Sequence, residues 1–298
     1  MAHRVQIASA DADRRLDKFL FAYLREAPHA LLYKLLRKKR IKLNGVRAEG
    51  NETLADGDML DFYLSPETLE TLRGERTIEP AEKLTGIIFE DDELLIVNKP
   101  VGLPSHGGLK KDHLLARVLY YLYDSGCYRP SDTFTPALCN RLDTNTSGVV
   151  VCGKTLHALQ KCTQLFANGG FEKEYYAIVE GKLEGEATLI GDYFKDETTN
   201  TAKITPHATT AKQAVTRYQS VAANDRYSLL RVYPITGRSH QIRAHMASIG
   251  HPLAGDKKYG GKPTSYAPAQ LLHAHRLTRK DTGDTWVAEL PAYFHIKI

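Results

Sequence analysis

The sequence predicts an α+β fold in which short helices and a largely antiparallel, mixed sheet alternate along the chain. Apolar residues between 16 and 24 recur with the period of an amphipathic helix. Two apolar runs, Ile87–Phe89 and Leu94–Val97, flank an acidic turn, which is typical of a β-hairpin. Residues 173–181 alternate as in a strand, with Tyr175 on one face and Tyr176 on the other. Further helices are expected over 114–123 and 154–167, and further strands over 149–153, 214–218 and 229–234.

Length and composition describe an ordinary globular chain of about two domains. The chain has 298 residues, 42% of them hydrophobic, and a net charge of +5, which is compatible with a polyanionic partner. Its four cysteines have no metal-ligand spacing and favour a reduced, cytosolic protein. The sequence shows no signal peptide and no apolar stretch long enough to span a membrane. We therefore expect a cytoplasmic protein without a membrane segment or a metal.

Residues 13–64 are expected to form a separate module. Two predicted helices, over 15–24 and 30–36, precede a strand that turns at Asn44-Gly45, a hairpin dipeptide. A second turn and strand follow over 57–64. Residues 65–84 are rich in Glu, Thr and Arg and poor in large apolar residues, so we expect a linker there. The second domain is then expected to cover residues 85–298.

Basic residues concentrate at the end of the second predicted helix, and no acidic residue interrupts them between 34 and 47. Such a cluster is typical of a surface that contacts a phosphate backbone. A solvated helix C-terminus, where the dipole favours cations, is the alternative. The expected RNA contacts in this cluster are Arg37, Lys38, Lys39, Arg40 and Lys42.

The polar stretch from Asn140 to Gly148 holds one carboxylate and one guanidinium and leads into the apolar run Val149–Val151. The β-branched run predicts a buried strand. Asp143 is therefore expected on a loop anchored by a rigid strand, which is a usual position for chemistry. A capping carboxylate in a surface turn is the alternative interpretation.

The segment that begins at Thr236 carries two arginines and two histidines. Thr236 is expected to cap a helix whose first turn holds Arg238 and His240. An arginine near a helix start opposes the helix dipole, so we expect an anion beside it, either a phosphate or a carboxylate such as Asp143. The two histidines lie five residues apart rather than four, so no metal site is expected.

The motif Arg141-Leu142-Asp143, followed by Thr146-Ser147-Gly148, resembles the catalytic motif of RNA pseudouridine synthases of the RluA, RluC and RluD type. The resemblance covers residues 87–295. The chain departs from the family at Asn140, where a histidine is more usual, and over 278–281, which lack a His-Pro pair. The other motifs of the family occur in order at 98–103, 173–181, 236–245, 250–260 and 272–274.

Residues 13–64 resemble the alpha-L RNA-binding module first known from a small-subunit ribosomal protein. The motif Arg-Leu-Asp lies at 15–17, Ile-x-Leu-Asn-Gly at 41–45 and Gly-Asp-x-Leu at 57–60. This resemblance implies RNA binding through the second helix and the basic strand after it.

The family resemblance implies an isomerase that converts uridine to pseudouridine in structured RNA without a cofactor or a metal. It makes Asp143 the carboxylate at the sugar, either as nucleophile at the anomeric carbon or as base toward the neighbouring sugar carbon. It pairs Arg238 with Asp143, and it makes Tyr175 the residue that stacks on the base and removes the final proton. Arg141, His240, Gln241 and Arg243 are further expected to contribute to RNA binding or to the structure of the site. For Arg141 alone, a structural ion pair is the favoured interpretation.

Large-subunit ribosomal RNA is the expected substrate and partner of a monomeric enzyme, with transfer RNA as the alternative. A catalytically silent RNA-binding protein of this fold and an N-glycosidase that uses the same carboxylate are further alternatives. The presence of Asp143, Tyr175 and Arg238 together favours the synthase. The active cleft is expected to cross the sheet between Asp143 and Tyr175.

Overall fold

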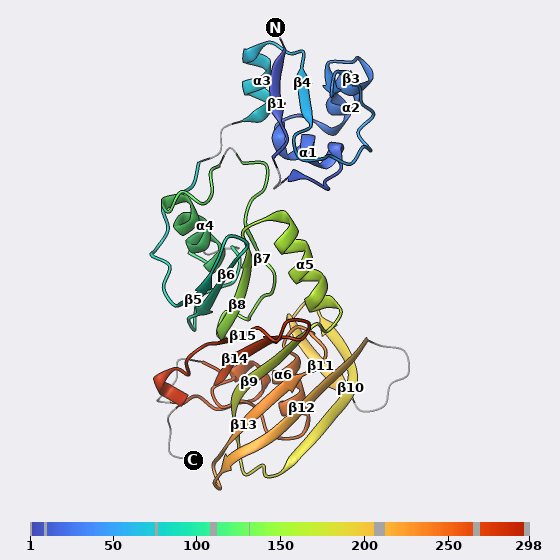
Figure 1. The fold of residues 1–298 in the computed structure, drawn as a ribbon. Coiled ribbons are helices and arrows are strands. Elements are labelled where there is room, and N and C mark those ends of the chain that lie inside the picture. Colours follow the sequence, from blue (N-terminus) through green and yellow to red (C-terminus); the bar gives the residue numbers. More distant parts are fainter. Residues whose placement is uncertain are drawn as a thin grey trace. The chain divides into compact units, whose positions relative to one another are not determined.

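The computed structural model divides into two compact units (Figure 1). Unit 1 comprises Met1–Pro80, Leu119–Pro136 and Lys154–Ala158, and unit 2 comprises the rest of the chain. No helix in the described part of the chain is long and apolar enough to cross a membrane. The structure describes residues 2–8, 11–74, 77–107, 112–130, 132–205, 212–264 and 269–294.

Unit 1 contains a four-stranded antiparallel sheet and the helices packed on it. The strand order is β1 (His3–Gln6), β4 (Met59–Phe62), β2 (Ile41–Leu43) and β3 (Val46–Arg47). The expected helices are confirmed as α1 (Leu16–Tyr23) and α2 (His29–Arg37). Their apolar stripes meet the strands in one hydrophobic core, whose buried members include Leu16, Phe19, Leu20, Leu32, Leu36, Leu60 and Phe62.

The expected hairpin at Asn44-Gly45 is also confirmed. β2 and β3 pair on either side of it, and both turn residues have positive φ, 50° and 78°. This conformation is the reason that Asn-Gly is favoured in two-residue hairpins. The side chain of Asn44 also accepts a hydrogen bond from the Met59 amide at 2.8 Å, which connects the hairpin to β4.

The expected linker over 65–84 is wrong in its first half. Residues Pro66–Arg73 form helix α3, whose Ser65 cap accepts a hydrogen bond from the Thr68 amide. Leu69 is buried in the core of unit 1, and β1 extends this unit before residue 13. Ser followed by Pro is a helix-start signal, and the polar composition of the segment obscured it. Residues 77–84 contain no helix or strand, while 75 and 76 lie outside the described residues.

Unit 2 is built on an eleven-stranded, mainly antiparallel mixed sheet, as expected. The only parallel pair in the described part of this sheet is β8–β14. β15 (Thr285–Val287) pairs with β14, and β7 (Ala137–Leu138) pairs with β8. The main path runs β11 (Thr201–Thr205), β10 (Glu186–Asp196), β12 (Lys212–Ala223), β13 (Tyr227–Pro234), β9 (Phe171–Glu180), β14 (Leu272–Arg279), β8 (Ser147–Gly153), β6 (Leu94–Lys99) and β5 (Ile87–Glu90).

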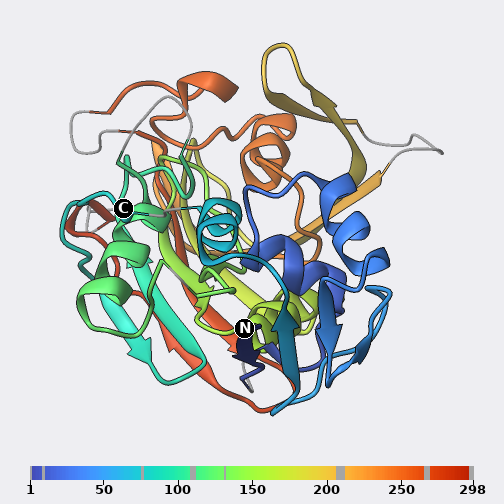
Figure 2. The same cartoon turned by 90° about the horizontal axis from the view of Figure 1, so that it is seen from above.

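Three further α-helices of the described chain, α4, α5 and α6, coincide with helical patterns or motifs in the sequence. The predictions over 114–123 and 154–167 are confirmed as α4 (Leu114–Asp124) and α5 (Leu156–Ala167). Helix α6 (Gln241–Ser248) packs on the face of β9 that carries Ala177 and Val179. Ile178 packs on the opposite face, so the predicted alternation of β9 is confirmed. Seen from above, β11 lies beside α6 (Figure 2).

The parallel pair β8–β14 depends on Gly148. Gly148 lies opposite Ala274 in the register and has φ +117°, a backbone conformation that other residues rarely adopt. A Cβ atom at this position would lie 2.1 Å from the Ala274 carbonyl oxygen. Because β8 follows the Asp143 loop directly, this close approach helps to determine where the loop ends.

We predict that Gly148→Ala lowers the free energy of unfolding of unit 2 by about 4 kcal/mol or more, because backbone strain and a backbone clash act together. Gly250→Ala is the matched control: its φ is +83° and no atom lies within 4 Å of the added Cβ. It should cost only the left-handed strain of about 1–2 kcal/mol. Urea unfolding of both variants measures the difference, and equal losses would contradict the role of the close approach.

Candidate active site

Asp143 lies on the loop between β7 and β8, and neighbouring side chains hold the backbone of this loop. The amide of Asn140 accepts a hydrogen bond from Val151 N at 2.8 Å and donates one to Val149 O at 3.3 Å. Ser105 Oγ donates to Leu142 O at 2.8 Å and accepts from Leu142 N at 3.1 Å. Asn140, the departure from the family motif, thus joins the loop to β8.

Lys99 at the end of β6 is fully buried and holds the other side of the loop. Its Nζ donates to Leu103 O at 2.7 Å and to Thr144 O and Pro100 O, each at 3.0 Å. Burial lowers the pKa of Lys99 to about 7, although the negative charge of Asp143 acts in the opposite direction. Lys99 therefore positions the residue that follows Asp143 and is closed to RNA.

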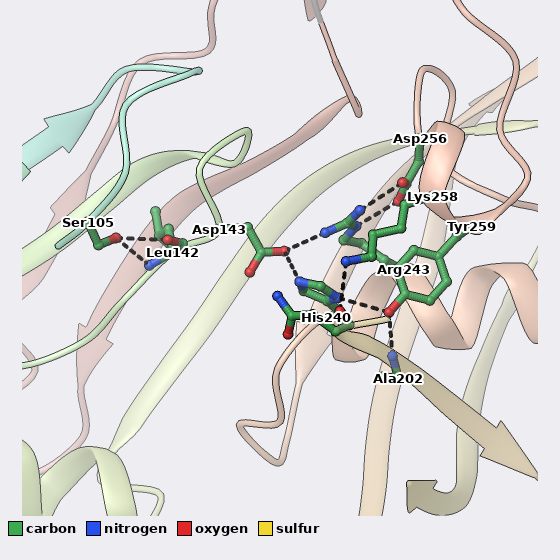
Figure 3. A network of polar contacts seen from close by, with 10 residues as sticks. Ser105, Leu142, Asp143, Ala202, His240, Arg243, Asp256, Lys258 and Tyr259 are labelled. Atoms are coloured by element: carbon green, nitrogen blue, oxygen red, sulfur yellow. Dashed lines mark hydrogen bonds and ion pairs between the residues drawn. The ribbon is translucent and has the colours of Figure 1, made fainter. Parts of the chain in front are cut away.

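The arginine that pairs with Asp143 is Arg243 (Figure 3). Its Nη1 donates to Asp143 Oδ2 at 2.9 Å, while Nε and Nη2 donate to the two carboxylate oxygens of Asp256 at 2.7 and 2.8 Å. Burial alone would lower the pKa of Arg243, but the hydrogen bonds and charges of Asp256 and Asp143 outweigh it and raise the pKa. One guanidinium thus bridges two carboxylates, in the bidentate geometry that arginine favours.

The expected pairing of Arg238 with Asp143 is wrong because helix α6 begins later than predicted. Its first residue is Gln241, and the N-cap is His240 with φ 54°. Thr236 does not cap the helix; its hydroxyl donates to Gln241 Oε1 at 2.7 Å instead. Arg238 consequently lies before the helix, where its Nε donates to Gln213 O at 3.4 Å. The anion expected beside Arg238 lies instead beside Arg243, in the first turn of the observed helix.

Two residues expected to contact RNA are used inside the protein. Gln241 is buried, and its Nε2 donates to Val215 O and Thr216 Oγ1, each at 2.9 Å. Arg243 is buried between its two carboxylates. Both side chains thus build the site, which is one of the two roles expected for them.

His240 and Tyr175 also face Asp143. His240 Nε2 lies 3.7 Å from Asp143 Oδ2, and Nδ1 lies 2.9 Å from the hydroxyl of Tyr259 (Figure 3). Tyr175 is half-buried on β9 and packs against the α6 side of the sheet. Burial and, secondly, the negative charge of Asp143 raise the pKa of Tyr175 above its ordinary value. Its phenol is therefore held in the protonated form.

Asp143, Tyr175 and His240 line one cleft of about 1040 Å³ within unit 2. Asp143 and Tyr175 both border it, as expected. Arg141 also borders the cleft and is exposed, and no carboxylate pairs with it within the described ranges. The structural ion pair expected for Arg141 therefore stays a prediction. The other cationic side chains of the lining are Lys173, Lys195, Arg238, Arg243, Lys257 and Lys258.

Sequence reasoning missed the residues that support Asp143. Asp256 and Tyr259 lie in the Gly250–Gly260 motif, where the pattern gave no sign that they meet Arg243. Lys99 and Ser105 contact only backbone oxygens and amides of the loop, and such contacts leave no local sequence signal. In the part of the chain that the structure describes, no group of three or more His, Cys, Asp or Glu side chains is placed to hold a metal ion.

Comparison with known proteins identifies the class of protein that has this cleft. Residues 93–248 match the family model described as RNA pseudouridylate synthase. The chain therefore belongs to the RNA pseudouridine synthase family, whose members are isomerases that act on RNA. The human protein "RNA Pseudouridylate Synthase Domain Containing 4" has the same fold, with a TM-score of 0.56 and 24% identity over 70% of this chain and 90% of that chain.

Curated relatives match nearly the whole chain. A Vibrio vulnificus protein named ribosomal large subunit pseudouridine synthase C is 32% identical over 286 residues, which cover 91% of this chain and 87% of the relative. The Escherichia coli protein of the same name is 31% identical over 306 residues, covering 96% and 92% of the two chains.

We predict that Arg243→Lys lowers the single-turnover rate at saturating RNA by about 100-fold, because an ammonium cannot bridge two carboxylates in the bidentate geometry. Arg238→Lys is the matched comparison, since Arg238 has no carboxylate partner within the described residues. It should leave this rate within about threefold and weaken only RNA affinity. An equal loss of rate in both variants would contradict the assignment of Arg243 as the partner of Asp143.

Proposed function

We propose that this chain converts specific uridines of large-subunit ribosomal RNA to pseudouridine, with Asp143 as the catalytic carboxylate. The observation that carries the proposal is the Asp143–Arg243 contact of 2.9 Å inside a cleft bordered by Tyr175. Relatives named for the large ribosomal subunit, which align with over nine-tenths of the chain, favour ribosomal over transfer RNA. We propose further that the enzyme acts as a monomer and in the cytoplasm, where a ribosomal substrate is found.

The reaction breaks the bond between the anomeric carbon and the uracil nitrogen, turns the base, and joins the same sugar carbon to C5. The proton on C5 then leaves, and the former glycosidic nitrogen gains one. Arg243 and His240 both approach Oδ2 of Asp143. Within the described residues no donor contacts Oδ1, so Oδ1 is the oxygen we assign to the substrate. As a nucleophile it would attack the anomeric carbon, and as a base it would take a proton from the neighbouring sugar carbon.

We assign Tyr175 the stacking role against the uracil. Its ring borders the cleft on the same face as Ala177, so it is held by the sheet. Its second expected role, removal of the C5 proton, requires a phenolate or a strong acceptor for the phenol proton. The raised pKa of Tyr175 works against the phenolate, whereas stacking depends only on the ring.

Binding of RNA is assigned to two groups of exposed cations. Arg141 and Arg238 border the cleft, where they would contact phosphates around the extruded nucleotide. Extrusion costs a few kcal/mol, so such contacts are needed to offset it. On unit 1, Lys42 lies over the ring of Tyr63 at 5.0 Å and is half-buried. The other proposed contacts of this unit are exposed: Arg37, Lys38, Lys39 and Arg40.

We predict that Asp143→Asn abolishes pseudouridine formation while RNA affinity stays within about threefold, because an amide has the same shape but is neither a nucleophile nor a base. Release of label from RNA carrying tritium at uracil C5 measures the reaction, and filter binding measures affinity. Activity at the wild-type level in this variant would refute the assignment. Free uracil as the product of the wild-type enzyme would indicate the N-glycosidase alternative.

We predict that replacing Arg37, Lys38 and Lys39 together by Gln weakens RNA binding by about tenfold or more at moderate salt and reduces the salt dependence of binding. The single-turnover rate at saturating RNA should not change. The matched control neutralises three exposed lysines that do not border the cleft, Lys83, Lys161 and Lys182. Equal effects of the two sets would show that only net charge matters and would remove the specific role of unit 1.

A further inference from the structure

The hydroxyl of Tyr259 connects β11 with the surroundings of Asp143. Tyr259 ends the short 3₁₀ helix η2 (Lys257–Tyr259), and its oxygen accepts a hydrogen bond from Ala202 N at 2.7 Å. The same oxygen lies 2.9 Å from His240 Nδ1. Its ring packs on the guanidinium of Arg243, with 4.9 Å between the ring centre and the guanidinium carbon (Figure 3). Tyr259 therefore touches both residues that approach Asp143 Oδ2.

The chemistry of these groups determines the direction of each hydrogen bond. A backbone amide only donates, so the Tyr259 oxygen accepts from Ala202 and its single proton is left for another partner. The partner within reach among the described residues is His240 Nδ1, which accepts when the phenol uses its proton for this contact. A neutral imidazole carries its proton on one nitrogen only, so this direction puts the proton of His240 on Nε2. That nitrogen is the one that lies 3.7 Å from Asp143.

Burial is the main reason that His240 favours its neutral form. Burial lowers the pKa of His240, and the negative charge of Asp143 acts in the opposite direction. Arg243 and Lys258 lower it further, while Asp256 raises it. The neutral ring is the state in which the hydrogen bond from Tyr259 determines the tautomer.

We propose that Tyr259 fixes His240 in the tautomer whose Nε2–H points at Asp143, so that His240 and Tyr259 are positioning residues for this carboxylate. The inference rests on the proposed role of Asp143. At 3.7 Å the His240–Asp143 contact is longer than a hydrogen bond, and we expect it to shorten in the complex with substrate. Together with Arg243 it directs Oδ2 toward the protein and leaves Oδ1 to the sugar.

Nitrogen NMR of the full-length protein with isotope-labelled histidine tests the tautomer directly and does not depend on activity. The His240 signals are assigned by their loss in His240→Gln. The expected spectrum at neutral pH shows a protonated Nε2 and an unprotonated Nδ1. In Tyr259→Phe, which keeps the ring over Arg243, the Nδ1 signal should shift because its hydrogen bond is lost. A protonated Nδ1 in the wild type, or no shift in Tyr259→Phe, would overturn the inference.

The activity test compares Gln with Asn at position 240. The amide nitrogen of Gln reaches the position of Nε2, whereas that of Asn reaches only the position of Nδ1. His240 has φ 54°, a conformation that Asn adopts more readily than Gln. If His240 had only a structural role, Asn would be the better substitute. If His240 acts as a hydrogen-bond donor through Nε2, Gln should be the better substitute.

In single turnover at saturating RNA, we expect His240→Gln to stay within about threefold of the wild type and His240→Asn to fall by about tenfold or more. Tyr259→Phe should lose about three- to tenfold in rate, with little change in RNA affinity. Equal rates for Gln and Asn, or a faster Asn variant, would overturn the inference. If Asp143→Asn were active while the tautomer was as expected, the proposed function of Asp143 would fail and the hydrogen-bond assignment would stand.

Discussion

The site depends on the ion pairs that the buried guanidinium of Arg243 makes with two carboxylates. Burying the charge of Arg243 away from water is costly unless negatively charged partners compensate for it. Asp256 and Asp143 are these partners. Asp256 takes two of the guanidinium nitrogens, so the third is left to point at Asp143. The position of the Asp143 carboxylate therefore depends on α6 and on the loop before η2, as well as on its own loop.

The Asp143 loop is held mainly through its backbone. Lys99 and Ser105 contact main-chain atoms of Thr144 and Leu142, the residues on either side of Asp143. The side chain of Asp143 is thereby left to contact Arg243 and, in the proposed function, the substrate. An arrangement of this kind pre-organises the site, because the loop does not have to be ordered when RNA binds. Asn140 is compatible with this arrangement, because its side-chain amide accepts a hydrogen bond from Val151 N and so connects the loop to β8.

Local sequence patterns predicted most elements of the fold. They failed to predict which arginine pairs with Asp143, because that pairing depends on a contact between residues far apart in the sequence. The helices α1 and α2, the hairpin at Asn44 and the two faces of β9 each follow from a period or a turn dipeptide. Which arginine meets a carboxylate 100 residues away depends on where α6 starts, and that start is a His240 in left-handed conformation. Neither the αL cap nor the pairing of Thr236 with Gln241 has a local signature, so Arg238 was a reasonable but wrong choice.

The two oxygens of Asp143 have different surroundings, and this asymmetry bears on the chemistry. Oδ2 faces Arg243 at 2.9 Å and His240 at 3.7 Å. A nucleophile needs one oxygen aligned with the anomeric carbon, and a base needs one oxygen aligned with the proton of the neighbouring carbon. Both mechanisms therefore require that rotation of the carboxylate be prevented, and cations or N–H groups gathered on one oxygen achieve this. The same protein geometry serves either mechanism, so it is the position of the sugar above Oδ1 that would distinguish them.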